Sequence, residues 1–151
     1  MTSHNTFLIG AAIMFLTGIG IPVMAAINGG LGRELGSATA ATAVLFAAGL
    51  LFALAALMTT GAPDWSRFGD ATPFRFFGAF FVVSYVLAVT WFAPRIGVGN
   101  AIFFVLLGQL VAAAAIDHFG WLGSTRFPIT PQRAIGLVVM ALGVYLAKRS
   151  T

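Results

Sequence analysis

The chain has 151 residues, of which 60% are hydrophobic and only 8% are charged, and it contains no Cys. A water-soluble domain carries about 25% charged residues, so this composition excludes an ordinary soluble enzyme and a disordered chain, and the lack of Cys excludes disulfides and thiolate metal sites. The formal net charge of +4 comes from scattered single residues. That distribution is typical of loop arginines at a membrane surface, so no nucleic-acid partner is expected.

Long apolar runs dominate the chain. A membrane-crossing helix needs about 20 mostly apolar residues. We predict five spans, at about residues 7–27, 37–58, 75–93, 99–119 and 131–147. Ser37 is placed to cap the second span, and Pro131 to begin the fifth. The sequence therefore predicts an all-α integral membrane protein, with one transmembrane domain of five helices over residues 1–151.

The basic residues divide equally between the two predicted membrane faces. The face with the N-terminus and the face with the C-terminus hold four each: Arg67, Arg75, Arg126 and Arg133 against Arg33, Arg95, Lys148 and Arg149. An excess of Lys and Arg on cytoplasmic loops normally sets orientation, so a tie predicts that copies insert both ways and pair as an antiparallel homodimer. The alternative is a chance tie, with one orientation set by other signals.

Polar positions inside the spans are the first candidates for a site, because a polar group in hydrocarbon needs a partner. Gln109, beside Gly108 near the middle of the fourth run, is expected in the bundle interior, either as a bond between helices or as a substrate contact. Pro22 predicts a kinked or unwound point in the first span, for packing alone or as part of a site. Asn28 is expected to cap the end of the first helix, with a cavity-lining role as the alternative.

Aromatic residues of the third run are further candidates. Tyr85 is placed deep in the span, and Trp91 lies near its end. Together with Phe81 they are able to form an aromatic wall for an organic cation. Trp91 is otherwise an interfacial anchor.

Small residues indicate where helices approach closely in lipid. On the fourth and fifth runs they are spaced to share one helix face, and either face is a candidate for the dimer contact: Gly108 and Ala112, and Gly136 and Gly143.

The four acidic residues all lie at or near span ends, so no carboxylate at mid-depth is able to exchange a proton for cargo. Asp117, beside His118, and Glu34, beside Arg33, remain candidates for proton coupling. The alternative for Asp117 is an interfacial carboxylate paired with an arginine. No catalytic triad, metal-ligand cluster or phosphate loop is present in the sequence, so no enzyme, metal or cofactor is expected.

Several short strings occur in order along the chain: residues 20–33 (GIPVMAAINGGLGR) with 35–37 (LGS), 94–97 (PRIG), 108–109 (GQ), 117–120 (DHFG), and 133–136 (RAIG) with Gly143. Together they resemble the YdcZ family, the five-helix branch of the drug/metabolite transporter superfamily. The chain departs from the family in having Met24 where we expect members often to carry Gln. The resemblance implies a multi-pass protein of the bacterial inner membrane. The four-helix multidrug exporters of the superfamily are similar in working as antiparallel dimers.

We therefore expect a small-molecule transporter that works by alternating access around a midplane cavity in an antiparallel homodimer. A neutral, zwitterionic or weakly charged cargo is expected, because the spans contain no buried charge. The alternatives are a non-transporting membrane subunit or scaffold, and a component of a lipid-headgroup flippase.

Overall fold

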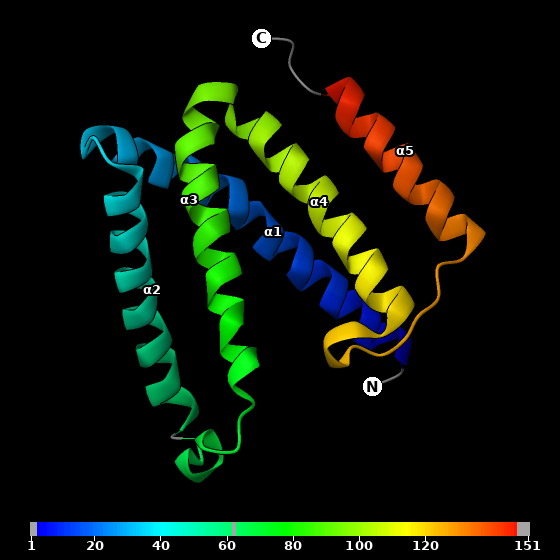
Figure 1. Ribbon diagram of the computed structural model, residues 1–151, viewed down its shortest axis with the longest axis horizontal. Coiled ribbons are helices and arrows are strands. Elements are labelled where there is room, and N and C mark those ends of the chain that lie inside the picture. The colour runs from blue at the N-terminus through cyan, green and yellow to red at the C-terminus, as the bar shows by residue number, and fades with distance from the viewer. Residues whose placement is uncertain (1–2, 62, 148–151) are drawn as a thin grey trace. The chain divides into compact units, whose positions relative to one another are not determined.

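The computed structural model of the chain describes residues 3–61 and 63–147, and these are helical except for short loops. The α-helices are α1 (Ser3–Glu34), α2 (Ala38–Thr60), α3 (Gly78–Ile96), α4 (Val98–Phe119) and α5 (Pro131–Ala147). Three short 3₁₀ helices, η1 (Trp65–Phe68), η2 (Pro73–Phe77) and η3 (Trp121–Gly123), lie in the loops after α2 and α4 (Figure 1).

The predicted all-α fold class is confirmed. Among the described residues, four helical segments are long and apolar enough to cross a membrane: Asn5–Glu34, Ala38–Thr60, Pro73–Ile96 and Val98–Phe119. The fifth helix, α5, is apolar but has only 17 residues. At 1.5 Å per residue it is about 25 Å long, slightly less than the hydrocarbon thickness of about 30 Å.

The end of the first helix differs from the prediction. α1 continues through Asn28 to Glu34, so the interpretation of Asn28 as a helix cap is wrong. The helix also passes through Pro22 without interruption, so the first span is not unwound there. The chain turns at Gly36, whose φ of +64° favours a residue without a side chain. Ser37 then caps α2 as predicted, by accepting a 3.1 Å hydrogen bond from the Ala40 N–H.

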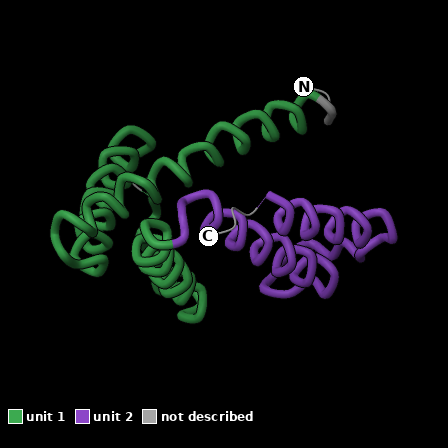
Figure 2. The backbone as a smooth tube through the Cα atoms, turned by 90° about the horizontal axis from the view of Figure 1, so that it is seen from above, with its two compact units in different colours: residues 1–95 green, residues 96–151 purple. Residues whose placement is uncertain are grey.

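The chain divides into two compact units, residues 1–95 and 96–151, which are coloured separately in Figure 2. In the first unit α1, α2 and α3 meet near the turn between α1 and α2, and the N-terminal half of α1 extends beyond the other two helices. Its described side chains between residues 5 and 24 are exposed or only half-buried. One transmembrane domain over residues 1–151 stays a prediction.

The core of the first unit is made of small side chains. On α3 the buried residues are Val86, Val89, Thr90 and Ala93, whose spacing places them along one helix face. Ala25, Asn28 and Gly29 of α1 and Ala41 and Thr42 of α2 are also buried. Small residues allow helix backbones to approach closely, which is the main source of attraction between helices in lipid.

In the second unit α4 and α5 run antiparallel, joined by the loop that contains η3 (Figure 1). α4 ends at Gly120, which adopts a left-handed conformation with φ +66°. A Cβ atom there would also lie 3.3 Å from the Cβ of Arg126, so both backbone geometry and space favour glycine. This turn directs the loop back along the end of α4.

Candidate functional site

A polar contact joins α1 and α3 in the core of the first unit. The side-chain amide of Asn28 donates a 2.6 Å hydrogen bond to the hydroxyl oxygen of Thr90. Both residues are almost fully buried, with exposed fractions of 2% and 3%. A buried amide without a partner would be costly in lipid, so this bond explains how Asn28 is accommodated inside a helix instead of at its end.

Close packing of glycines surrounds this bond. A Cβ atom on Gly29 would lie 3.0 Å from Cγ of Pro94, and one on Gly32 would lie 3.2 Å from Cγ2 of Thr90. Gly32 also faces α2, since its Cβ would be 3.5 Å from Cα of Ala38. These glycines therefore serve as contact points of a continuous helix.

Beside this packing lies a cavity of about 380 Å³. It is lined by the end of α1 and the following turn, including Gly32, Arg33 and Ser37, and by the end of α3, including Thr90, Trp91 and Arg95. The lining contains two arginines and no acidic residue. The cavity is therefore suited to an anion.

The ring of Trp91 is in contact with Arg95 of the same helix. The guanidinium carbon of Arg95 lies 4.0 Å from the centroid of the Trp91 ring, a cation–π arrangement. Arg95 Nη1 also donates to the Trp91 carbonyl oxygen. Trp91 itself is half exposed, as expected of an interfacial anchor. One face of the ring is thus occupied by the protein's own cation.

Two hydroxyls of the first unit are buried without a hydrogen-bond partner among the described residues, those of Thr42 on α2 and Tyr85 on α3. Buried polar groups are normally paired, and an unpaired one requires an explanation. Tyr85 as a whole is half-buried, and its depth in the span stays a prediction. Phe81, the third member of the predicted aromatic wall, is exposed.

In the second unit the predicted site residues of α4 lie on the surface of the single chain. Gln109, Gly108 and Ala112 are all exposed. The place of Gln109 in the bundle interior stays a prediction. No hydrogen bond joins its amide to another described residue. Since lipid offers no hydrogen bonds, this amide needs a partner in the membrane.

Asp117 is held in a network at the end of α4. Its Oδ2 lies 2.7 Å from Nη2 of Arg133 at the start of α5, an ion pair that is about one-third exposed. The backbone oxygen of Asp117 accepts a 2.8 Å hydrogen bond from the Phe127 N–H, and the Ser124 hydroxyl lies 3.4 Å from its Oδ1. This geometry matches the paired-carboxylate alternative considered for Asp117.

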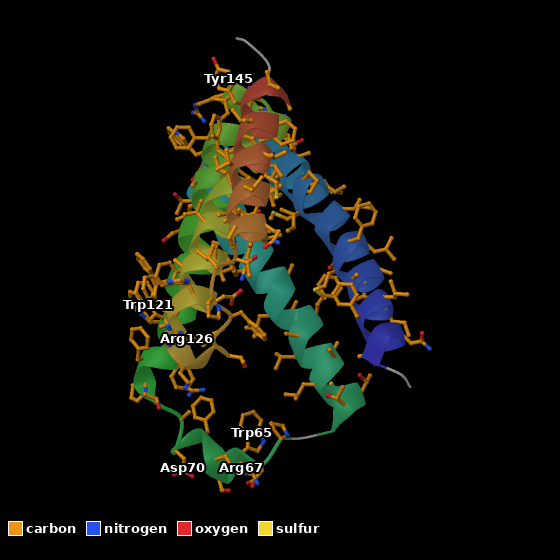
Figure 3. All side chains as sticks on the ribbon, turned by 90° about the vertical axis from the view of Figure 1, so that its right-hand side faces the viewer. Trp65, Arg67, Asp70, Trp121, Arg126 and Tyr145 are labelled. Atoms are coloured by element: carbon orange, nitrogen blue, oxygen red, sulfur yellow. The ribbon has the colours of Figure 1, made fainter. Side chains whose placement is uncertain are left out.

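His118, next to Asp117 at the end of α4, also bonds to the loop that follows. Its Nδ1 accepts a 3.0 Å hydrogen bond from the Ile129 N–H, and its carbonyl oxygen accepts one of 3.1 Å from Nε of Arg126. Trp121 and Arg126 lie together in this loop, whereas Tyr145 lies at the other end of α5 (Figure 3). The loop is thus tied to the end of α4 by several bonds that do not involve Asp117's carboxylate.

The remaining predicted positions are not brought to a site within the chain. Glu34 is exposed at the end of α1 and forms no ion pair with a described residue. Gly136 and Gly143 on α5 are exposed, with open space where a side chain would be. Lys148 and Arg149, counted in the charge balance, lie outside the described residues. Among the described residues no group of three or more His, Cys, Asp or Glu is placed to hold a metal ion.

Sequence reasoning missed Thr90 and the arginine pair of the cavity. A threonine inside a span is able to bond back to its own helix, as Thr17 does to the carbonyl oxygens of Ile13 and Met14, so Thr90 carried no signal of a contact between helices. The strings around Arg33 and Arg95 carried the family resemblance. Nothing in the sequence, however, indicated that these two segments meet, because 62 residues separate Asn28 from Thr90.

One comparison with known proteins identifies the chain. A family model described as "Putative inner membrane exporter, YdcZ" matches residues 9–146, which is nearly the whole sequence. No curated protein and no solved structure matches the chain.

Proposed function

The chain belongs to the YdcZ family of inner membrane exporters, and on that premise we propose that it carries a small molecule by alternating access around a midplane cavity in an antiparallel homodimer. The protein is a multi-pass protein of the inner membrane, and its family is one of transporters and not of enzymes. The substrate contacts, the dimer and its orientation are the parts that we propose.

The observation that carries the proposal is an exposed amide on α4 between small residues. Gln109 is exposed near the middle of a long apolar helix, flanked by exposed Gly108 and one turn from exposed Ala112. Lipid offers no hydrogen bonds to an amide, and small neighbours permit close approach of another helix. A second copy of the chain would supply the missing partner and enclose Gln109 in the dimer, together with a cargo.

The equal division of basic residues supports the antiparallel arrangement. Many transporters contain two inverted repeats with the substrate site between them at the bilayer midplane. A chain with five helices supplies one repeat, and an oppositely oriented copy supplies the other. Two identical units that exchange conformations give inward-open and outward-open states of equal energy, as alternating access requires.

Transport by the protein alone is the decisive test. Proteoliposomes that contain only the purified protein should take up a component of a metabolite pool. Gln109→Leu should lower the uptake rate by about tenfold, which is the effect of losing one well-placed hydrogen bond. Val111→Leu changes another exposed position of α4 and serves as the matched control, with uptake unchanged. Absence of uptake by the wild-type protein would instead support a scaffold, and movement of labelled lipid in the same vesicles a flippase.

Orientation is tested separately. The chain has no Cys, so Thr2→Cys and Thr151→Cys each create a single thiol. In intact cells an impermeant thiol reagent should label about half of the molecules at either terminus, since a charge tie gives both orientations similar weight. Labelling confined to one terminus would contradict the antiparallel homodimer.

A further inference from the structure

The cavity at the ends of α1 and α3 has the chemistry of an anion site. Its lining includes Arg33 and Arg95 but neither Asp nor Glu. Neither arginine forms an ion pair within the described part of the chain, where the pairs are Arg67 with Asp64 and Arg133 with Asp117. Glu34, the nearest acid in sequence, is exposed and is not part of the lining. The carbonyl ends of α1 and α3, where the two arginines lie, offset part of their charge, but no carboxylate of the lining does.

The two arginines come from segments that pack closely against each other at glycines of α1. Arg33 follows Gly32, which packs against Thr90, and Arg95 follows Pro94, which packs against Gly29. Arg95 is further restrained by its stacking on Trp91 and by one bond to the Trp91 carbonyl oxygen. A guanidinium has five N–H donors, so a restrained Arg95 keeps others for a ligand at little additional entropy cost.

Neutral donors complete the lining. Ser37 accepts from the Ala40 N–H, which leaves its own hydroxyl hydrogen available to a ligand. Thr90, a residue that is 3% exposed, accepts from the Asn28 amide and also lines the cavity. The N-terminus of α2 at Ala38 also lines the cavity and adds the positive end of a helix dipole.

From these observations we infer that the cavity binds a phosphate-bearing anion. Arginine forks match phosphate oxygens in geometry and charge. The cavity of about 380 Å³ is large enough for a phosphate ester group and not merely for a water molecule. Because it lies where the apolar helices α1 and α3 end, a phospholipid headgroup and a soluble phosphate ester are both able to reach it.

This site is independent of the transport proposed above. Gln109 lies on α4, in the other unit, and takes no part in the cavity lining. Loss of anion binding and loss of uptake are therefore separate results, and each is measured on its own.

Lipid binding is measured by native mass spectrometry of the detergent-purified full chain, titrated with phosphatidylglycerol and, in parallel, with phosphatidylcholine. The wild-type protein should retain phosphatidylglycerol in preference to phosphatidylcholine. Arg33→Gln with Arg95→Gln should weaken phosphatidylglycerol binding by about tenfold or more, because charged hydrogen bonds are lost. Arg33→Lys with Arg95→Lys keeps the charges and should restore part of the binding.

The matched control is Arg75→Gln, which removes an exposed arginine of η2 that is not part of the cavity. It should leave phosphatidylglycerol binding unchanged. Thermal unfolding of every variant without lipid shows whether the fold is intact, and the Lys pair provides a second measurement if the Gln pair unfolds.

Competition distinguishes the two sources of phosphate. If glycerol 3-phosphate displaces phosphatidylglycerol and raises the unfolding temperature of the wild-type protein but not of the Gln pair, the site accepts soluble phosphate esters. If phosphatidylglycerol alone binds, the ligand is a lipid headgroup. Equal phosphatidylglycerol binding by the Gln pair and by Arg75→Gln, or no binding of either ligand by the wild-type protein, would overturn the inference.

Discussion

Asn28 on α1 and Thr90 on α3 form a buried hydrogen bond of 2.6 Å across 62 residues of sequence. Just after Asn28 in α1, Gly29 and Gly32 bring the two helices into contact at Pro94 and Thr90. The bond and the glycines depend on each other, because the amide reaches the hydroxyl only when the backbones are close. This contact also holds together the two segments that carry the arginines of the cavity.

The first prediction concerns this bond. Thr90→Val keeps the side-chain shape but leaves the buried Asn28 amide without its acceptor, and should destabilise the protein by about 1 kcal/mol. Adding Asn28→Leu removes the stranded amide as well, so the double variant should lose less stability than the sum of the single losses. Denaturation in detergent measures these differences.

Thr17→Val is the control for that series. The Thr17 hydroxyl bonds only to carbonyl oxygens of its own helix and is exposed, so its loss should leave stability unchanged. Strictly additive effects of Thr90→Val and Asn28→Leu would show that the bond carries no coupling energy.

The second prediction compares two adjacent glycines. A Cβ atom on Gly29 would be 3.0 Å from Cγ of Pro94, whereas one on Gly30 would meet only the flexible end of Arg33, at 3.9 Å. Gly30→Ala should stabilise α1 by about 0.5 to 1 kcal/mol through helix propensity. Gly29→Ala raises the helix propensity of α1 equally, but the new Cβ must displace Pro94. The Gly29→Ala protein should therefore be less stable than the Gly30→Ala protein by about 1 kcal/mol or more. Equal melting temperatures would refute the close contact.

The third prediction addresses Asp117. Its ion pair with Arg133 joins α4 to α5 at 2.7 Å, so Asp117→Asn and Arg133→Gln should each cost about 0.5 to 1 kcal/mol, reduced by solvent screening because the pair is partly exposed. Exchanging the two residues, Asp117→Arg with Arg133→Asp, should recover part of the loss. Thermal unfolding of the four proteins measures this.

Transport at different pH separates this structural role from proton coupling at Asp117. If pairing is its role, Asp117→Asn keeps the wild-type pH dependence of uptake between about pH 5 and about pH 8. A pH profile flattened by Asp117→Asn would make the carboxyl a coupling group instead, whatever the change in melting temperature.

The fourth prediction concerns the loop between α2 and α3, where Trp65, Arg67 and Asp70 lie together (Figure 3). The pKa of Asp64 is lowered, first by the hydrogen bond from the Ser66 hydroxyl, then by the Ser66 N–H, and least by Arg67. Ser66→Ala should therefore raise the pKa of Asp64 more than Arg67→Gln does, as followed by NMR of the carboxyl carbon.

The lowered pKa of Asp64 also makes the stability of the loop depend on pH. A carboxyl whose pKa is lower in the folded state stabilises the loop at pH values above its ordinary pKa, and this contribution is lost as the pH falls through the lowered value. Ser66→Ala should make the loop less sensitive to acid. A larger effect of Arg67→Gln than of Ser66→Ala would contradict the order of causes.

Local pattern determined much of the structure. The apolar runs predicted an all-helical membrane protein, and the ends of α2, α4 and α5 lie within a few residues of the predicted bounds, because the length and composition of a span follow from the bilayer alone. Ser37 was identified as a cap because an N-cap hydroxyl bonds within its own turn. The family also followed from short strings read in order.

The tertiary structure decided what the glycines, Asn28 and the arginines do. Asn28 followed by Gly29 and Gly30 has the local signature of a helix end, yet the helix continues, because Thr90 and Pro94 from a distant segment satisfy the amide and fill the space above the glycines. In the sequence, Arg33 and Arg95 are two of eight basic residues with nothing to relate them. The packing of α1 against α3 brings both to the lining of one cavity. The solvent determines which segments become helices, and contacts between segments far apart in the chain determine which side chains meet.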